Sequence, residues 1–281
     1  MPLYFGVQRL VRRALDRLVD ARAAARLREI PNRLNEYGYD AWGFNPEWAK
    51  YFFTIAAWLY RYYWRVEVHG IEHVPRGRVL LIANHGGQLP ADGFMLATAL
   101  LLEGRPPRLV RGMAERWFPT LPFFSWAMPR FGQVVGNPHN CVKLLENEEA
   151  VMVFPEGVRG SGKLFRDRYR LMEFGHGFMR LALRTRTPIV PVGIIGSEEQ
   201  APSFADLKPL ARLLGFPYFP LGPTLGLPLP TKYRIYLDEP LVFEGDPDEP
   251  DREMAKKVEV VKAKIARLLH YGLASRKAVF W

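Results

Sequence analysis

One short segment carries residue types that could do acid–base chemistry together. It is ANHGGQLPADG, residues 83–93, in which Asn84 and His85 follow an apolar run and Asp92 follows a glycine-containing turn. An imidazole can remove a hydroxyl proton near neutral pH, and a carboxylate can fix its tautomer and stabilise the imidazolium. A histidine before a turn is more often structural when it stands alone. With Asp92 as the only carboxylate of the turn, the alternative is a general-base pair of His85 and Asp92.

A second segment, VFPEGVRGSGK at residues 153–163, combines a buried strand with a turn rich in glycine and charge. Glu156, Gly157, Arg159 and Lys163 stand in this turn, where glycines admit a close ligand and Arg and Lys supply charge-assisted donors. It is not a nucleotide-binding P-loop, because Leu164 occupies the position that requires Ser or Thr. The competing interpretation is an ordinary turn with solvated charges.

The elements around these segments alternate between strand-like and helix-like patterns. This alternation predicts an α/β fold with a mixed, mostly parallel sheet flanked by helices. Pro191 is expected at an edge, a bulge or a strand end, and residues 201–230 are expected to form a long apolar loop. Strands are predicted at 78–83, 108–113, 133–135, 150–154, 189–195 and 233–237, and helices at 92–102, 140–149 with Asn140 as N-cap, 171–186 and 251–270.

The N-terminal part, residues 1–65, reads as a helical element separate from an α/β domain of residues 66–281. Residues 7–19 place apolar side chains on one helical face with arginines beside it, and residues 46–65 form a helix dense in Trp, Tyr and Phe. Such amphipathic and aromatic segments favour contact with a membrane surface, the alternative being packing against the α/β domain.

Composition indicates the class of partner and the cellular compartment of the protein. The 281 residues are 48% hydrophobic with a formal net charge of +10, which indicates a large core and an anionic partner such as lipid, nucleic acid or a phosphate-bearing substrate. The single cysteine, Cys141, excludes an intramolecular disulfide and fits a reducing compartment. No secretory signal and no apolar run long enough to span a bilayer are visible, so we expect a peripheral or monotopic protein on the cytoplasmic face.

Taken together, these segments resemble the glycerolipid acyltransferase family, which contains the lysophosphatidic acid acyltransferases. The resemblance covers about residues 66–243, with the blocks NH…D at 84–92, FPEGxR at 154–159 and VPV at 190–192. It implies the fold of that family and an O-acyltransferase activity, like that of 1-acylglycerol-3-phosphate O-acyltransferases. The acyl group would come from acyl-CoA or acyl carrier protein, directly and without an acyl-enzyme, a metal or a cofactor.

By the same resemblance, His85 would deprotonate the hydroxyl of a glycerolipid acceptor such as a lysophospholipid, and Asp92 would orient it. The polar head of the acceptor would contact Glu156, Gly157 and Arg159. Asn84, Lys163 and Arg111 are further candidates for substrate binding.

Two departures from the family pattern bear on the acceptor. Six residues rather than four separate His85 from Asp92, so the turn must bulge, which Gly86, Gly87 and Pro90 make feasible. The second block, FGQVVGN at residues 131–137, ends in Asn137 where the family usually has a phosphate-binding Arg; Arg111, Arg116 or Arg130 could substitute. These departures, and the apolar loop, resemble the monoacylglycerol and diacylglycerol acyltransferase-like branch, whose acceptors are neutral.

Two alternatives belong to other classes of function. The altered His–Asp spacing would also fit a catalytically silent lipid-binding protein of the same fold. Nucleic-acid binding is suggested by charge alone, and no nucleic-acid-binding module supports it, so no nucleic-acid partner is expected. His139 and His176 are interpreted as loop or structural residues.

Overall fold

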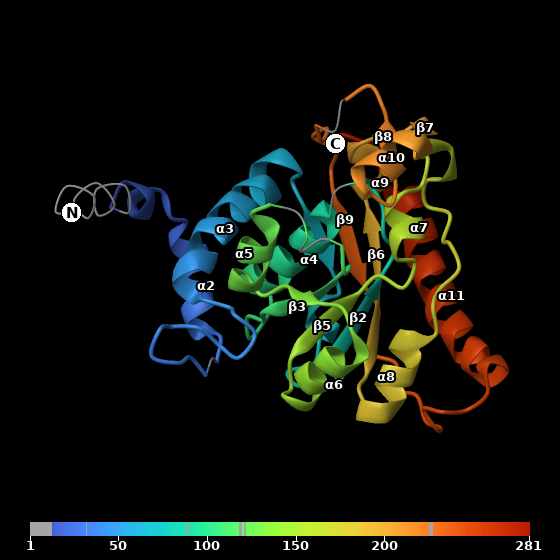
Figure 1. Ribbon diagram of the computed structural model, residues 1–281, viewed down its shortest axis with the longest axis horizontal. Coiled ribbons are helices and arrows are strands. Elements are labelled where there is room, and N and C mark those ends of the chain that lie inside the picture. The colour runs from blue at the N-terminus through green and yellow to red at the C-terminus, as the bar shows by residue number, and fades with distance from the viewer. Residues whose placement is uncertain (1–12, 32, 89, 118–119, 121, 225–226) are drawn as a thin grey trace.

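The protein is built on a twisted seven-stranded sheet that lies among its helices in a computed structural model (Figure 1). The structure describes residues 13–281 apart from 32, 89, 118–119, 121 and 225–226. The strand order is β1-β9-β6-β2-β5-β3-β4. The strands are β1 Glu67–His69, β2 Val79–Ala83, β3 Val110–Ala114, β4 Val134–Val135, β5 Ala150–Val153, β6 Ile189–Ile195 and β9 Arg234–Leu237.

Five adjacent strands, from β6 to β4, run parallel, and β9 reverses the direction by pairing antiparallel with β6. The predicted mixed, mostly parallel sheet is therefore confirmed. Because β2, β5, β3 and β4 are parallel neighbours, the loops that follow them meet at one edge of the sheet, where α/β proteins place their ligands.

Helices cover both faces of the sheet (Figure 1). One face carries α2 Ala21–Glu29, α3 Pro46–Trp58, α4 Ala91–Leu102 and α5 Phe124–Arg130; the other carries α6 Pro138–Glu146, α8 Gly177–Thr185 and α11 Asp251–Ser275. Short elements complete the chain: η1 Leu59–Tyr63, η2 Ile71–His73, α7 Val158–Ser161, η4 Phe165–Asp167, α9 Ser197–Gln200, β7 Ala205–Asp206, α10 Lys208–Leu214 and β8 Pro220–Leu221.

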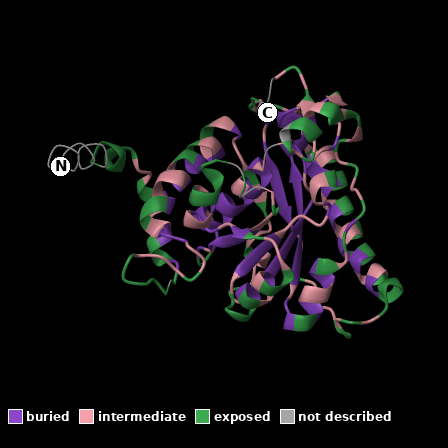
Figure 2. Cartoon of the chain, in the orientation of Figure 1, coloured by how far each residue is buried: buried purple, intermediate pink, exposed green. Residues whose placement is uncertain are grey.

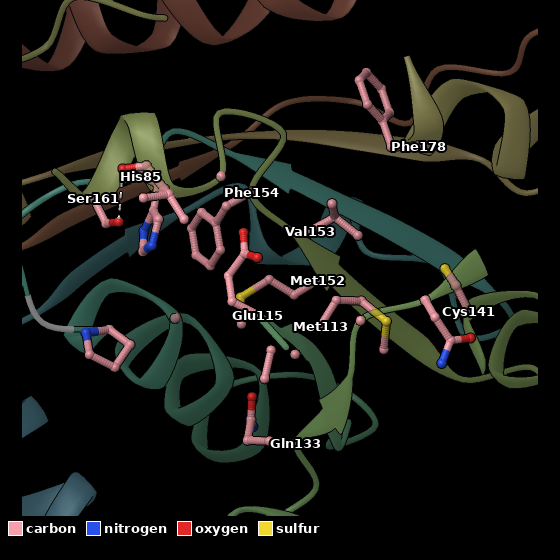
Figure 3. Close-up of a pocket in the computed structure, with 18 of the residues that line it drawn as sticks. His85, Met113, Glu115, Gln133, Cys141, Met152, Val153, Phe154, Ser161 and Phe178 are labelled. Carbon is pink, nitrogen blue, oxygen red and sulfur yellow. Dashed lines mark hydrogen bonds between the residues drawn. The ribbon is translucent and has the colours of Figure 1, made fainter. Parts of the chain in front are cut away.

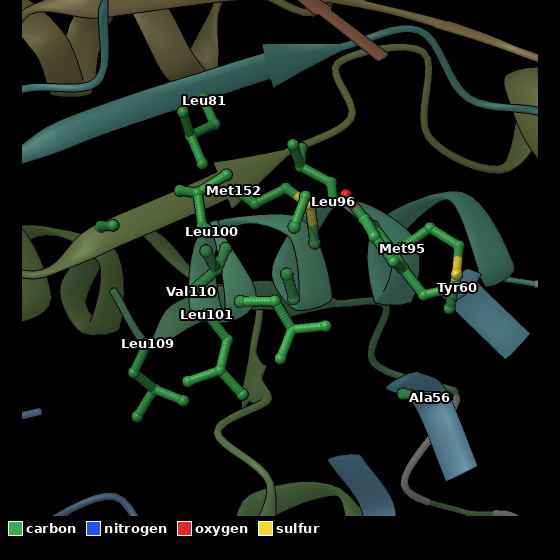
Figure 4. Close-up of a cluster of buried hydrophobic side chains, with 14 of the residues drawn as sticks. Ala56, Tyr60, Leu81, Met95, Leu96, Leu100, Leu101, Leu109, Val110 and Met152 are labelled. Carbon is green, nitrogen blue, oxygen red and sulfur yellow. The ribbon is translucent and has the colours of Figure 1, made fainter. Parts of the chain in front are cut away.

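Strand β2 shows how the sequence builds the core. All five of its residues are buried, and successive side chains point to opposite faces of the sheet. Leu81 packs with the cluster around α4 (Figure 4), whereas Leu80 and Ile82 pack with α6, α8 and α11. Figure 2 shows the resulting buried sheet between partly exposed helices. The sheet is thus a rigid base for the loops at its edge.

Several predicted elements begin or end elsewhere. Helix α6 begins at Pro138 and is capped by Asn137, whose side chain accepts the backbone N–H of Asn140; the prediction of Asn140 as N-cap was wrong. Helix α8 begins at Gly177 rather than at residue 171, because the backbone N–H of Met172 is bound by Glu156 instead of a helical carbonyl. Residues 201–230 are not structureless, since β7, α10 and β8 lie within them.

Pro191 lies in an interior strand, which the sequence argued against. Its Cα pairs with Ile82 of β2, and its carbonyl accepts the N–H of Asp238, just past the end of β9. The chain after β9 returns to the strand only at Leu241, which pairs with Ile189. Pro191 thus faces a gap in the pairing, where a missing N–H leaves no partner unsatisfied.

The N-terminal helices pack into the same core as the sheet. Ala23 and Leu27 of α2 and Phe53 of α3 are buried in the cluster that contains α4. Of the predicted amphipathic helix at 7–19, residues 13–18 are helical and residues 7–12 lie outside the described part. No helix in the part of the chain that the structure describes is both long and apolar enough to cross a membrane.

Candidate active site

The candidate site lies where four parallel strands end side by side. His85 follows β2, Glu156 and Gly157 follow β5, Glu115 follows β3 and Asn137 follows β4. These residues are separated by up to 72 positions in the sequence, yet the strand order brings them to one edge of the sheet.

His85 and Asp92 form the predicted pair. The Nδ1 atom of His85 is 2.7 Å from Oδ2 of Asp92, and the carboxylate is fully buried. The same oxygen accepts the backbone N–H of Gly86, and Asp92 lies in the first turn of α4, where the helix dipole favours a negative charge. The carboxylate is therefore fixed, and it leaves Nε2 as the imidazole nitrogen available to a substrate.

The six-residue gap between the two side chains is accommodated by an unusual turn. Gly87 and Gln88 both have positive φ, 89° and 65°. A Cβ on Gly87 would lie 2.0 Å from the carbonyl oxygen of Ser197, so this position needs both the conformation and the size of glycine. The extra residues therefore lengthen the turn without separating His85 from Asp92.

Opposing effects act on the imidazole of His85. Burial disfavours the imidazolium and would lower the pKa, whereas the charge and hydrogen bond of Asp92 raise it, with a smaller contribution from Glu156. The outcome is a pKa above the ordinary value for histidine. The ring also stacks on Phe154 at a centroid distance of 4.3 Å, which fixes its plane.

A buried ionic cluster supports the backbone of His85. Glu156 accepts the backbone N–H of His85 through Oε1 and that of Met172 through Oε2. Lys163 lies 3.3 Å from Oε2 of Glu156 and 2.9 Å from Glu198, and each of these three side chains is at least 97% buried. Glu156 and Lys163 are thus placed behind His85, where they support the loop rather than line the cavity.

The remaining predicted residues differ in position. Asn84 exchanges two hydrogen bonds with the backbone of Ile194, which joins β2 to β6 beneath His85. Arg111 is buried in ion pairs with Asp40 and Glu149 and does not line the cavity, so the structure does not bring it together with His85. Gly157 lines the cavity, and a side chain at its φ of +55° would be strained.

Arg159 lies on the exposed rim of the site. Its side chain pairs with Glu173 and retains 60% of its surface. It is absent from the cavity lining, so contact between Arg159 and a substrate head group stays a prediction.

A cavity of about 370 Å³ opens in front of His85 (Figure 3). Its walls come from both sides of the sheet edge and are mainly apolar: Phe94, Met113, Met128, Cys141, Met152, Val153, Phe154, Phe178 and Leu181. The cavity can therefore hold a flexible apolar chain beside the imidazole of His85.

Several lining residues were not identified from the sequence. Tyr218 lies within residues 201–230, which were expected to form a loop. Ser161 and Gln133 lie within the segments 153–163 and 131–137, but neither was predicted to contact a substrate. Glu115 follows a strand at the same edge as His85, and that position was the available signal. Glu198, beneath His85, stands just after the VPV block in a fully buried SEEQ segment.

Comparison with known proteins finds an acyltransferase family model and several relatives. A family model described as Acyltransferase matches residues 65–195. An uncharacterized protein of Mycobacterium tuberculosis is 39% identical over 260 residues, which cover 88% of this chain and 72% of the relative. A human protein named DGAT1/2-independent enzyme synthesizing storage lipids is 29% identical over 194 residues, or 68% of this chain and 57% of that protein.

A solved structure shares the fold. It is the 1-acyl-sn-glycerophosphate (LPA) acyltransferase PlsC from Thermotoga maritima, with a TM-score of 0.53, 18% identity and coverage of 82% of this chain and 83% of that one. On this shared fold, the chain places a His–Asp pair beside an apolar cavity. The chain belongs to the glycerolipid acyltransferase family.

Proposed function

We propose that the protein transfers a fatty acyl group from acyl-CoA or acyl carrier protein to a hydroxyl of a glycerolipid, with His85 as general base. The observation that carries this proposal is the 2.7 Å contact between His85 and the buried Asp92 carboxylate at the mouth of an apolar cavity. Neither a lipid-binding module nor a nucleic-acid-binding protein requires a buried, oriented base at that place.

The chemistry follows from the orientation of the imidazole. With Nδ1 held by Asp92, Nε2 accepts the proton of the acceptor hydroxyl as its oxygen attacks the thioester carbonyl. The tetrahedral intermediate then expels the thiolate, and the imidazolium donates its proton to that thiolate. Asp92 stabilises the imidazolium between these two steps.

Direct transfer is favoured because the potential nucleophiles of the cavity are inactive. Burial raises the pKa of the Cys141 thiol to about 12, which leaves almost no thiolate at neutral pH. The hydroxyl of Ser161 donates to the carbonyl of Val158 rather than to a base. We therefore expect no covalent acyl-enzyme.

The working location that suits this reaction is a membrane surface. Helix α3 and η1 expose Trp48, Ile55, Trp58 and Tyr62 at helical spacing, and the ring of Trp48 lies 5.1 Å from that of Trp126 on α5. Aromatic side chains of this type favour the interface between water and lipid. This surface supports peripheral binding, with basic residues Arg13 and Arg17 in the exposed helical segment before it.

Two kinds of acceptor are compatible with the motifs, a lysophospholipid and a neutral mono- or diacylglycerol. Asn137 stands at the usual position of the phosphate-binding Arg, and its side chain caps α6. The human relative is named for the synthesis of storage lipids. Both observations favour the alternative candidate, the neutral acceptor.

Replacement of His85 tests the proposal. His85→Ala and His85→Gln should each reduce acyl transfer by about 10²–10⁴-fold, the usual contribution of a general base. His270→Ala is the matched control, because His270 is exposed on α11 and should leave turnover unchanged. Unchanged turnover in a correctly folded His85→Ala protein would instead favour a catalytically silent lipid-binding role.

A further inference from the structure

We propose that Glu115 selects the acyl acceptor: its carboxylate binds a free hydroxyl of the acceptor and excludes acceptors with an anionic head group. The inference rests on the proposed acyl transfer and adds a residue that determines specificity. It follows from the place of Glu115 in the cavity and from the charges of the other lining residues.

Glu115 lies on the same edge of the sheet as His85. The two follow β3 and β2, which are separated by β5 alone, so their strands are about 10 Å apart. Oε1 of Glu115 would lie 3.3 Å from a Cβ on Gly157, which places the carboxylate over the loop between the two strands. In Figure 3 it projects into the cavity near Phe154. A glycerol backbone whose reacting hydroxyl is at His85 can present another hydroxyl to Glu115.

The charge of the cavity is unsuited to a phosphate. Among the described residues that line it, the ionisable carboxylate is Glu115, and no Lys or Arg is present. Glu115 forms no ion pair with any residue in the described ranges. The other polar lining groups are uncharged: Gln88, Gln133, Asn137, Ser161 and Tyr218. An anionic head group would thus meet a carboxylate without a compensating cation.

The arginines that could reverse this balance lie elsewhere. Arg111 is held by Asp40 and Glu149, and Arg159 pairs with Glu173 on the rim. The guanidinium of Arg130 lies over the Trp126 ring at 4.1 Å. Arg116 is exposed and does not line the cavity. Among the described residues that line the cavity, Glu115 is therefore the carboxylate that an acceptor meets beside His85, and it is exposed to solvent.

The test compares a neutral with an anionic acceptor that share one acyl chain. Monooleoylglycerol and oleoyl lysophosphatidate are offered with oleoyl-CoA to the full-length protein, and kcat/KM is measured for each. Glu115→Gln and Glu115→Arg should lower the neutral-to-anionic ratio by about tenfold or more, chiefly through KM. Glu146→Gln removes an equivalent charge from the exposed end of α6 and should leave the ratio unchanged.

Binding to a His85→Ala background gives the same comparison without turnover. Short-chain forms of the two acceptors, which stay monomeric, should bind with affinities in the order neutral above anionic, and Glu115→Arg should reverse that order. Ratios that are unaffected by both Glu115 substitutions, in turnover and in binding, would overturn the inference. Activity that survives His85→Ala would overturn the proposed function instead, so the two failures are distinguishable.

Discussion

At the residue scale, the site depends on groups behind His85 as much as on His85 itself. The backbone N–H of His85 is bound by Glu156, and Glu156 is held in turn by Lys163 and Met172. A Cβ on Gly160 would lie 3.0 Å from the Cβ of His85, so the loop also packs closely against the histidine. The FPEGVR segment therefore positions the backbone of His85, the proposed base.

Lys163 is expected to be essential for this arrangement. Lys163→Met would leave Glu156 and Glu198 buried together without their cation, a change that typically costs about 3–5 kcal/mol. Burial raises the pKa of Glu198, and Lys163 opposes that effect, so the substitution should also favour protonation of Glu198. Chemical denaturation measures the loss of stability.

An exposed ion pair provides the control for Lys163. Lys256→Met removes a surface partner of Glu253 on α11 and should change the free energy of unfolding by less than about 1 kcal/mol. Equal effects of the two substitutions would contradict the supporting role of the buried cluster.

The contact between His85 and Asp92 could be predicted from the sequence because the motif places both residues at one turn. The positions of Asn84, Glu156 and Lys163 behind His85 could not be predicted from the sequence. Their types suit substrate binding, but whether a polar side chain faces a cavity or the protein depends on partners such as Ile194 and Glu198, far away in the sequence.

At the element scale, helix α3 has two faces with different tasks. Ala49, Phe53 and Ala57 are buried in the core, whereas Ile55 and Trp58 expose 64% and 54% of their surface. The two alternatives considered for this helix were membrane contact and packing, and each corresponds to a different face. The packing face is seen in the structure, and membrane binding by the other stays a prediction.

Charge on the exposed face of α3 should weaken membrane binding. Ile55→Glu combined with Trp58→Glu is expected to reduce flotation with anionic liposomes by about tenfold or more, since each side chain contributes roughly 1–3 kcal/mol on burial. The control is Val260→Glu on α11, which lies on the opposite side of the molecule (Figure 1) and exposes 47% of a valine. Equal flotation of all variants would contradict a role for α3, and binding to DNA in preference to liposomes would favour the nucleic-acid alternative.

The boundaries of some elements could not be predicted for a similar physical reason. Local signals placed α4 and β6 correctly, because their apolar patterns are long and bounded by turns. The start of α8 depends on the contact of Met172 with Glu156, and the tolerance of Pro191 depends on where β9 ends. Both are tertiary effects that propensity does not contain.

At the scale of the whole molecule, the sheet converts distant segments into one site. The alternation of strands and helices sufficed to predict this architecture, and with it the edge at which His85 lies. The division at residue 65 stays a prediction about domains, but α2 and α3 share one buried cluster with α4 and the sheet. The N-terminal helices therefore contribute to the stability of the fold that holds the site.

The most direct test of the central claim is the pH dependence of kcat/KM in the wild type and in Asp92→Asn. His85 must be neutral to accept a proton, and its pKa is raised, so activity of the wild type should fall with decreasing pH from a point above 6.5. Asp92→Asn removes the charge that raises this pKa while burial remains, so the acidic limb should move to lower pH and kcat should fall by about 10²–10⁴-fold. An acidic limb that stays in place in Asp92→Asn, with kcat unchanged, would contradict the account.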